Sequence, residues 1–528
     1  MLLDRTFHPD EANQAFTVGK LLETGTYTYK PTDHHGPTLY YAAAPLQKAF
    51  GHADTASMDG TVLRCTPLVF AILGLILGGL AVKRLTKSFW AALGFILLLG
   101  SAPIFVFFAT DFIQEMLLVC FLLGMYWSAT GYLYPGKRLK PGSWALFFGV
   151  FAGLAFATKE TSLISFAAAG LASLPFLFKR RTSNLEHQTS NIKHQSLFHV
   201  SLAIAGFAMT SVVLFSSLCT NWEGVFNAFV AAPLAYLGRG VGNAAASVGA
   251  NWHVHPWWQY ANWLFSHPPF SELDLFVVAF AACPLFLGIL RFAFLRADAK
   301  RAHFVQFKPE KPKPSIYPSL GPWIFALLYS SILFSIYSLI PYKTPWCALQ
   351  FLPGVALAAI LGLHAVAVRI GGRLVPALIA FAVVAGVVIF RQPALEKMNQ
   401  DPDSKDIPFN YANASPEVKD LAACVTAAMT AETPRVGPLA ESPAEKFIAV
   451  ALPTADTWPF PWYNRPYEGR TGYWTTFEDL VTLQKSGIKP TVVIVPMTEG
   501  HLVQPLFPHL KNTKRFYMRP KVRVRVFW

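Results

Sequence analysis

Two adjacent carboxylates, Asp10 and Glu11, lie in the polar segment before the first long apolar run of the chain. A carboxylate can take a proton from an attacking hydroxyl group, which is the task of a general base in group transfer. Ionisable groups at a membrane surface tend to be functional. A solvated loop is the alternative interpretation of this pair. Asp10 and Glu11 are therefore the first candidates for catalysis.

Two more carboxylates, Asp111 and Glu115, follow the second apolar run. Residues four apart share one face of a helix, so a helix here would present both side chains together. A negative charge near a helix N-terminus is also favourable in itself. For Asp111 we prefer this capping role, with substrate binding as the alternative. For Glu115, deeper in an apolar helix, we prefer a functional role.

Two lysines interrupt apolar sequence. Lys159 and its neighbour Glu160 separate two apolar runs, and Lys343 follows Tyr342 between two prolines that would break a regular helix. A lysine at this depth needs an anion. Glu160 is one possible partner of Lys159, and a lipid phosphate is the other. Lysines that hold a phosphate leaving group beside a carboxylate base would suit a transfer reaction.

Histidines and one arginine complete the candidate set. His34 and His35 precede a Gly-Pro turn and are candidate phosphate contacts, with ligation of a divalent metal as the alternative. Arg239, in the loop 220–273, is a further candidate phosphate contact. The Trp and His residues later in that loop are typical of an interfacial aromatic belt, and metal binding is the less favoured interpretation. No cofactor follows from these residues with certainty.

Composition places the chain in a membrane. Hydrophobic residues make up 53% of the sequence and charged residues only 14%, which is typical of a polytopic membrane protein. About 20 apolar residues span a bilayer as a helix. About ten such helices are predicted, at residues 61–82, 88–108, 112–134, 143–158, 161–178, 198–219, 274–295, 322–340, 345–367 and 374–391.

The positions of Lys and Arg predict the orientation. These residues gather in every second loop, and short loops rich in them stay in the cytoplasm. The segment around Asp10, the turns at Asp111 and Lys159, the loop 220–273 and all residues after 391 are therefore predicted outside the cytoplasm. The chain is predicted to be a multi-pass protein of the cytoplasmic (inner) membrane. Its excess of positive charge is mostly a topology signal, so nucleic acid is not an expected partner.

The sequence predicts three domains. Residues 1–60 form an exterior first loop with interfacial helices, residues 61–391 form the transmembrane domain, and residues 392–528 form an exterior domain. No apolar helix precedes the first polar segment, so we expect a further helix before Met1.

The exterior domain after residue 391 is predicted to be an α/β domain. Helix-like sequences at 414–429 and 475–487 alternate with strand-like sequences at 446–452 and 491–496.

Between them lies an aromatic segment that contains Trp462 and Arg465. These two side chains are candidates to stack on a sugar and to pair with an anionic acceptor. The alternative is that they only dock the domain onto the membrane loops.

Several motifs together resemble the membrane glycosyltransferases of the GT-C superfamily. They are the early Asp-Glu pair, HHGPTLYY at 34–41, SAPIF at 101–105, GLAFATK at 153–159 and SLIPYKTPW at 338–346. The closest resemblance is to protein mannosyltransferase and aminoarabinose transferase relatives, and within them to the flippase-activity-associated family of archaeal N-glycosylation.

This resemblance implies an inverting transfer of a monosaccharide from a polyprenyl-phosphate donor to a lipid, glycan or protein acceptor on the outer face. It implies that Asp10 is the base, that Glu11 and Glu115 support or orient it, that Lys159 and Lys343 hold the lipid phosphate, and that His35 lines the donor pocket. Some members of the superfamily need a divalent metal. The alternative function is a non-enzymatic flippase accessory or transporter that binds a lipid-linked sugar. A transporter would show internal repeats, and the sequence has none that we detect.

Overall fold

A computed structural model of the 528-residue chain describes residues 2–31, 35–183, 191–235, 253–267, 269–270, 320–370, 375–386, 391–411, 413–431 and 446–528. The chain forms two compact units. The helical unit comprises Thr26–Tyr41 and Arg64–Asn399, and the sheet unit comprises Met1–Gly25, Ala42–Leu63 and Gln400–Trp528. The chain thus passes between the units four times. The predicted boundaries at residues 60 and 391 stay predictions.

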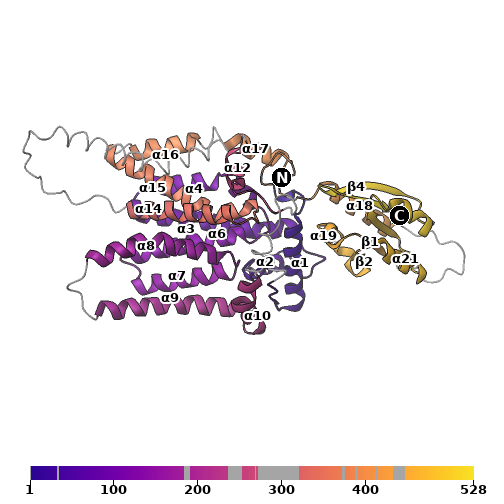
Figure 1. The fold of residues 1–528 in the computed structure, drawn as a ribbon, viewed down its shortest axis with the longest axis horizontal. Coiled ribbons are helices and arrows are strands. Elements are labelled where there is room, and N and C mark those ends of the chain that lie inside the picture. Colours follow the sequence, from indigo (N-terminus) through magenta and orange to yellow (C-terminus); the bar gives the residue numbers. More distant parts are fainter. Residues whose placement is uncertain are drawn as a thin grey trace, which may run out of the picture. The chain divides into compact units, whose positions relative to one another are not determined.

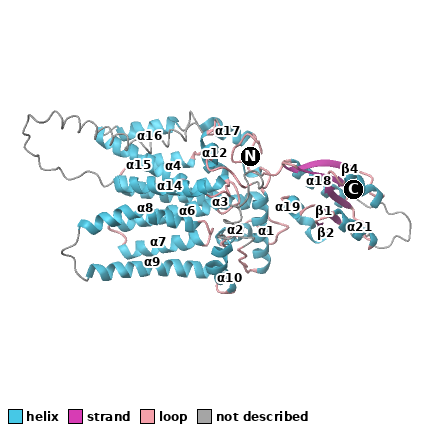
Figure 2. Ribbon diagram, in the orientation of Figure 1, coloured by secondary structure: helices cyan, strands magenta, loops and turns pink. Residues whose placement is uncertain are grey.

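The helices that build or enter the helical unit (Figure 1) are α2 (Thr38–Ala49), α3 (Gly60–Thr86), α4 (Phe89–Gly100), α5 (Pro103–Ala109), α6 (Glu115–Leu133), α7 (Pro141–Phe156), α8 (Ser162–Ser183), α9 (Asn191–Phe215), α10 (Glu223–Phe226) with the π-helical turn Asn227–Ala231, α12 (Gln259–Phe265), α14 (Leu320–Leu339), the 3₁₀ turn Pro345–Gln350, α15 (Leu352–Ile370), α16 (Val375–Gly386) and α17 (Gln392–Gln400). Figure 2 shows that helices dominate this unit.

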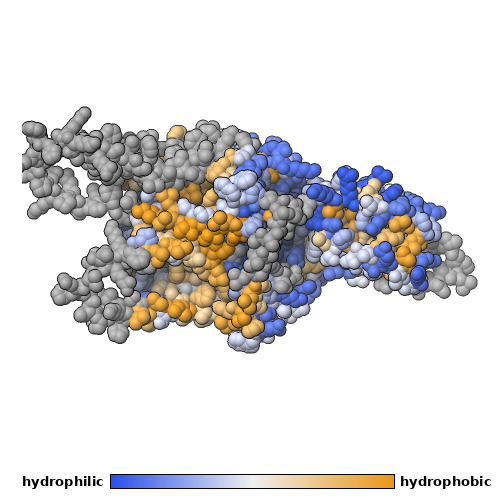
Figure 3. Space-filling view, in the orientation of Figure 1, coloured by the Kyte–Doolittle hydropathy of each residue, from blue (hydrophilic) through white to orange (hydrophobic). Residues whose placement is uncertain are grey.

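Within the described residues, five helices are long and apolar enough to cross a membrane. The bent pair α4 and α5, with 72° between its halves, makes a sixth span if it counts as one. On the face shown in Figure 3, apolar side chains gather over the helical unit. Most predicted runs correspond to one helix, but 88–108 is divided between α4 and α5, and 345–367 between a 3₁₀ turn and α15. The run 274–295 lies outside the described residues. The polytopic helical class is therefore confirmed.

Small residues let helices α7 and α9 pack closely. A Cβ atom on Gly149 would lie 1.9 Å from the carbonyl oxygen of Ala203, so only glycine fits there. Close backbone approach through small residues is a common way for membrane helices to associate. The contact therefore helps to position the C-terminal ends of α7 and α9, and polar residues follow both ends in the sequence.

The sheet unit begins with the 3₁₀ turn Leu2–Asp4, which is followed by α1 (Pro9–Thr24). His8 caps this helix: its side chain accepts the Asp10 N–H, while the Glu11 carboxylate accepts the His8 N–H at 2.9 Å. Pro9 occupies the first turn, where its missing N–H costs nothing. Gly25 ends the helix with a φ of 70°, a conformation that favours glycine.

The C-terminal part of the sheet unit is a mixed α/β region. Its elements are α18 (Glu417–Thr430), β1 (Ile448–Ala451), α19 (Thr454–Thr457), α20 (Phe460–Asn464), the 3₁₀ turn Arg465–Arg470, β2 (Thr471–Trp474), α21 (Phe477–Lys485), β3 (Val492–Pro496), α22 (Gly500–Leu506), β4 (Thr513–Arg519) and β5 (Val522–Phe527). The strand order is β2-β1-β3-β5-β4. Strands β1, β2 and β3 are parallel, while β5 is antiparallel to both β3 and β4.

Successive side chains of a strand belong in turn to two hydrophobic cores, one on each face of the sheet. Ile448, Ile494 and Val524 belong to the core that includes α18 residues, and Ala449 and Val493 belong to the core that includes α21 and α22 residues. Because successive residues of a strand point to opposite faces, each face of the sheet acquires its own helical cover. The predicted C-terminal α/β class is confirmed.

Candidate functional site

Glu115 and Lys159 form an ion pair inside the helical unit. Glu115 is the first residue of α6, Lys159 lies in the turn between α7 and α8, and the Lys159 ammonium donates to the Glu115 carboxylate. Both side chains are less than 10% exposed. Burial disfavours the ammonium, yet the Glu115 carboxylate holds the pKa of Lys159 above its usual value. Lys159 therefore pairs with Glu115 and not with its neighbour Glu160, while the binding of a lipid phosphate by Lys159 stays a prediction.

Glu160 has different partners, His35 and Tyr29. The Glu160 Oε2 atom lies 2.9 Å from His35 Nδ1, and the Tyr29 hydroxyl donates to Oε1. Adjacent residues in a turn point in different directions, which separates Glu160 from the ion pair of Lys159. Glu160 thus holds His35, the predicted donor-pocket residue, although the sequence analysis considered Glu160 as a partner of Lys159.

The segment that carries His35 is itself held on the ends of the helices. The Tyr27 hydroxyl donates to the His35 carbonyl at 2.5 Å, and the Tyr27 N–H donates to Ser217 Oγ at 2.9 Å, just beyond α9. A Cβ on Gly36 would lie 2.2 Å from the Ala157 carbonyl oxygen, so this close approach requires glycine. Tyr27 and Tyr29 were not predicted as site residues, although a pair of tyrosines two apart in a polar loop is a visible signal.

Acid should weaken the fold through Glu160. Burial by itself raises the pKa of this carboxyl, but the neighbouring His35 and hydrogen bonds from His35 and Tyr29 lower it to about 2, from 4.5. A depressed folded-state pKa stabilises the fold above the free value and loses that stabilisation as the pH falls from 4.5 towards 2. We expect the melting temperature in detergent to fall less over this window for Glu160→Gln than for the unmodified protein. If the melting temperatures of the two proteins fell equally with pH, the stabilising role assigned to Glu160 would be contradicted.

Lys343 is buried and bonded to carbonyl oxygens. Its ammonium donates to the Ile340 carbonyl and, at 3.3 Å, to the His255 carbonyl, and burial lowers its pKa. A two-residue antiparallel bridge fixes this turn, with the Lys343 N–H on the His253 carbonyl at 2.8 Å and the His255 N–H on the Pro341 carbonyl at 3.1 Å. In the described part of the chain Lys343 contacts no carboxylate, so its charge is not balanced by an anionic side chain. Its neighbour Tyr342 is 40% exposed.

A buried polar network links the Lys159 turn to the segment after Lys343. Gln350 Oε1 accepts hydrogen bonds from Ser165 and Tyr337, both at 2.8 Å, and Gln350 Nε2 donates to Thr161 at 3.0 Å. The predicted site did not include Gln350. Its signal in the sequence is a single amide within an apolar run, where a polar side chain needs partners.

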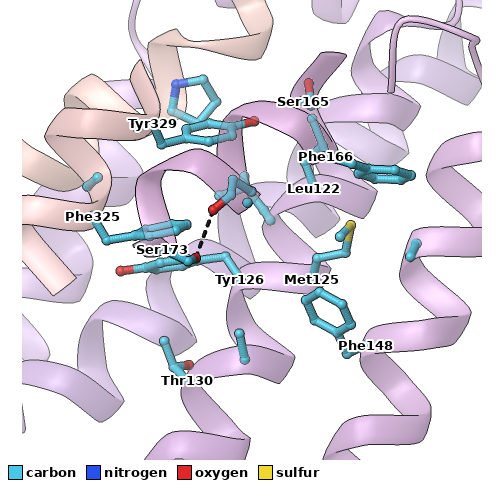
Figure 4. A pocket seen from close by; sticks show the side chains of 18 of the residues that line it. Leu122, Met125, Tyr126, Thr130, Phe148, Ser165, Phe166, Ser173, Phe325 and Tyr329 are labelled. Carbon is cyan, nitrogen blue, oxygen red and sulfur yellow. Dashed lines mark hydrogen bonds between the residues drawn. The ribbon is translucent and has the colours of Figure 1, made fainter. Parts of the chain in front are cut away.

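An apolar cavity of about 940 Å³ lies next to Ser165 of this network (Figure 4). Residues of α6, α7, α8, α9, α14 and α15 line it, and Ser165 and Gln350 belong to its wall. Along α6 the lining runs from Val119, about one turn past Glu115, to Tyr134. At 1.5 Å per residue this wall is about 22 Å long. The cavity is therefore long, and most of the side chains that line it are apolar.

In the sheet unit, Asp10 is the accessible member of the acidic pair. Its side chain is 52% exposed and lies 3.8 Å from His8 Nδ1, whereas Glu11 is fully buried and caps α1. Glu11 therefore holds the first turn that presents Asp10. This arrangement is compatible with the predicted division of roles between base and support.

The comparisons with solved structures bear on this architecture. No family model matches the sequence, and no curated protein does. The chain is similar in structure to ArnT from Cupriavidus metallidurans bound to undecaprenyl phosphate, with a TM-score of 0.59 and 12% identity, over 100% of this chain and 95% of that one. The fold is ArnT-like. The apo state of the same protein gives a TM-score of 0.56 and 13% identity, over the same shares of both chains.

A more distant similarity extends to the oligosaccharyltransferase AglB from Archaeoglobus fulgidus, in complex with an inhibitory peptide and a dolichol-phosphate. Its TM-score is 0.49 at 13% identity, over 94% of this chain and 66% of that one. The similarity to ArnT confirms the predicted likeness to GT-C glycosyltransferases at the level of fold. The finer resemblance to the flippase-associated family of archaeal N-glycosylation stays a prediction.

Within the ArnT-like fold, Trp462 and Arg465 are engaged in the packing of the sheet unit. The Trp462 ring is buried and stacks on Phe7, with ring centroids 4.6 Å apart, and the Arg465 guanidinium lies 4.0 Å from the Trp462 centroid. Arg465 also donates to the Met58 carbonyl at 2.7 Å. A ring covered in this way offers no face to a sugar. Both side chains therefore take part in the packing of the sheet unit, and the binding of an acceptor by them stays a prediction.

The other predicted residues divide as follows. Asp111 is buried but precedes α6, whose N-cap is Gln114, so Asp111 and Glu115 do not share a helix face and Asp111 is not the cap. The break occurs because residues 110–114 form turns between α5 and α6. His34 and Arg239 lie outside the described residues. Over the residues that the structure describes, no three His, Cys, Asp or Glu side chains gather as metal ligands.

Proposed function

We propose that the chain is a membrane glycosyltransferase that moves a monosaccharide from a polyprenyl-phosphate donor to an acceptor outside the cytoplasm. One observation carries this proposal: in an ArnT-like fold, a long apolar cavity extends along α6 from about one turn past the Glu115–Lys159 pair. Such a cavity suits an apolar chain, and a charged cluster at one end suits its polar head.

The phosphate of the donor is assigned to Lys343 rather than to Lys159. Lys159 already has a buried carboxylate partner, whereas the described contacts of Lys343 are carbonyl oxygens. A cation without an anionic partner gains most from an arriving phosphate. Lys159 then acts indirectly. A hydrogen bond between Thr161 and Gln350 links the turn of Lys159 to the segment that follows Lys343.

The transfer step is assigned to Asp10 as general base. The acceptor hydroxyl attacks the anomeric carbon, its proton passes to the Asp10 carboxylate, and the sugar–phosphate bond breaks so that polyprenyl phosphate leaves with the bonding electrons. A single displacement inverts the anomeric configuration. Asp10 is exposed enough to meet an acceptor.

A cavity-filling variant tests the lipid part of the proposal. Gly170 lines the cavity, and a Cβ at this position would meet nothing within 4 Å. Gly170→Phe should therefore place a ring in the cavity and weaken binding of undecaprenyl phosphate, used as the probe, by about tenfold or more. The neighbouring Leu171 is 50% exposed and does not line the cavity, so Leu171→Phe is the matched control. Equal affinities of the two variants, measured by native mass spectrometry, would refute the lipid assignment.

Turnover separates an enzyme from a binding protein. The reconstituted chain is incubated with a panel of undecaprenyl-phosphate monosaccharides and a membrane extract as the source of acceptors. We expect at least one donor to be consumed with release of undecaprenyl phosphate. Tight binding of donors without any release would support the alternative function of a non-enzymatic, lipid-linked-sugar binding protein.

A further inference from the structure

The end of the chain is strongly basic. Residues 500–528 contain seven Lys and Arg residues and no Asp or Glu, whereas the whole chain has a formal net charge of +14. Half of the net charge therefore belongs to this segment, which contains α22 and the hairpin of β4 and β5. This concentration is not explained by cations in loops between membrane spans.

Three arginines of the hairpin share one face. Arg515 lies directly opposite Arg525, and Tyr517 lies opposite Arg523, in the antiparallel register of β4 and β5. The alternate residues Phe516 and Val524 point into the hydrophobic core on the other side of the sheet. We call Arg515, Arg523 and Arg525, with Tyr517 among them, the basic face.

This face is costly for the fold. Like charges directly opposite each other on neighbouring strands are destabilising. Arg523 lies 4.8 Å from the Tyr517 ring centroid and Arg525 donates to Thr513 at 3.1 Å, but the described residues supply no carboxylate to any of the three arginines. The hairpin does have an ion pair elsewhere, between Arg519 and Asp456. An arrangement of this kind calls for an anion from outside the chain.

Protection of a sheet edge explains only part of the pattern. Edge strands often carry Lys and Arg to prevent pairing with other chains, and β4 is an edge strand. Strand β5 lies inside the sheet between β3 and β4, so edge protection gives no reason for Arg523 and Arg525. Their presence indicates that the basic face binds one partner with all three arginines.

We propose that the basic face docks on the anionic phospholipid headgroups of the membrane that holds the helical unit. The face is a ladder of cations on a sheet, in which the stem of Arg525 packs against Gly500 of α22. A ladder fits an extended charged surface better than a single small anion. Guanidinium groups bind phosphates through two parallel hydrogen bonds. The four chain crossings between the units keep the sheet unit tethered to a membrane protein, which raises the effective concentration of headgroups.

Arginine footprinting on the full chain in nanodiscs tests this inference. The rate at which phenylglyoxal modifies Arg515 is measured by mass spectrometry in discs of phosphatidylcholine alone and in discs that also contain phosphatidylglycerol. We expect the rate to fall severalfold in the anionic discs and to recover in about 0.5 M salt, where the screening length is only a few ångströms. Equal rates in the two kinds of disc would overturn the proposal without any variant.

Charge variants then locate the contact. The double variant Arg523→Gln/Arg525→Gln should weaken docking by about thirtyfold, equivalent to about 2 kcal/mol, and should abolish the protection of Arg515. Lys485→Gln/Lys489→Gln removes the same charge from exposed positions outside the hairpin and should keep the protection. Protection that survives the arginine variant would overturn the proposal. Protection by soluble polyphosphate but not by anionic discs would also overturn it, and would point to a soluble polyanionic ligand.

Discussion

Asp10→Asn should lower sugar transfer by about two to four orders of magnitude, because the amide cannot accept the proton of the acceptor hydroxyl. The substitution changes little else. The side chain is half exposed, and the helix cap relies on the Asp10 backbone N–H and on Glu11, both of which remain. We therefore expect an unchanged melting temperature and unchanged binding of undecaprenyl phosphate. Release of undecaprenyl phosphate from an accepted donor is the measurement.

Two variants serve as controls for Asp10. Asp4→Asn removes an exposed carboxylate from the same N-terminal segment and should leave transfer unchanged. Glu11→Gln keeps an acceptor for the His8 N–H, so it should lower transfer far less than Asp10→Asn does. Normal turnover by Asp10→Asn would exclude it as the base.

Lys159→Met should destabilise the helical unit by about 3–5 kcal/mol, because it leaves the Glu115 carboxylate buried without its cation. The double variant Glu115→Gln/Lys159→Met removes both charges and should recover most of the lost stability. Thermal unfolding in detergent of the unmodified protein, both single variants and the double variant gives the coupling free energy between the two residues. Additive effects of the two single changes would mean that the ion pair does not stabilise the fold.

The same set of proteins separates stability from donor binding. If Lys343 holds the phosphate, Lys343→Met should weaken binding of undecaprenyl phosphate more than the stable Glu115→Gln/Lys159→Met protein does. This expectation replaces the idea from the sequence that both lysines share one phosphate. The opposite order of affinities would return the phosphate to Lys159.

The sequence by itself determined the class of the protein. Long apolar runs must be helices in a membrane, since a helix satisfies its backbone hydrogen bonds internally. The alternation of helical and strand patterns after residue 391 was likewise sufficient for the α/β region, because hydrophobic periodicity is local. The motifs around Asp10, Lys159 and Lys343 were enough to suggest a GT-C-like fold, and the similarity to ArnT confirms that suggestion.

Only the tertiary structure decided the partners of the charged residues. Lys159 and Glu160 are neighbours in sequence, yet Lys159 pairs with Glu115 and Glu160 pairs with His35, because the turn sends their side chains in different directions. Trp462, taken from the sequence as a sugar-stacking residue, stacks instead on Phe7, some 450 positions away. Which charge meets which, and which ring is covered, depends on contacts between distant segments, and local patterns carry no information about such contacts.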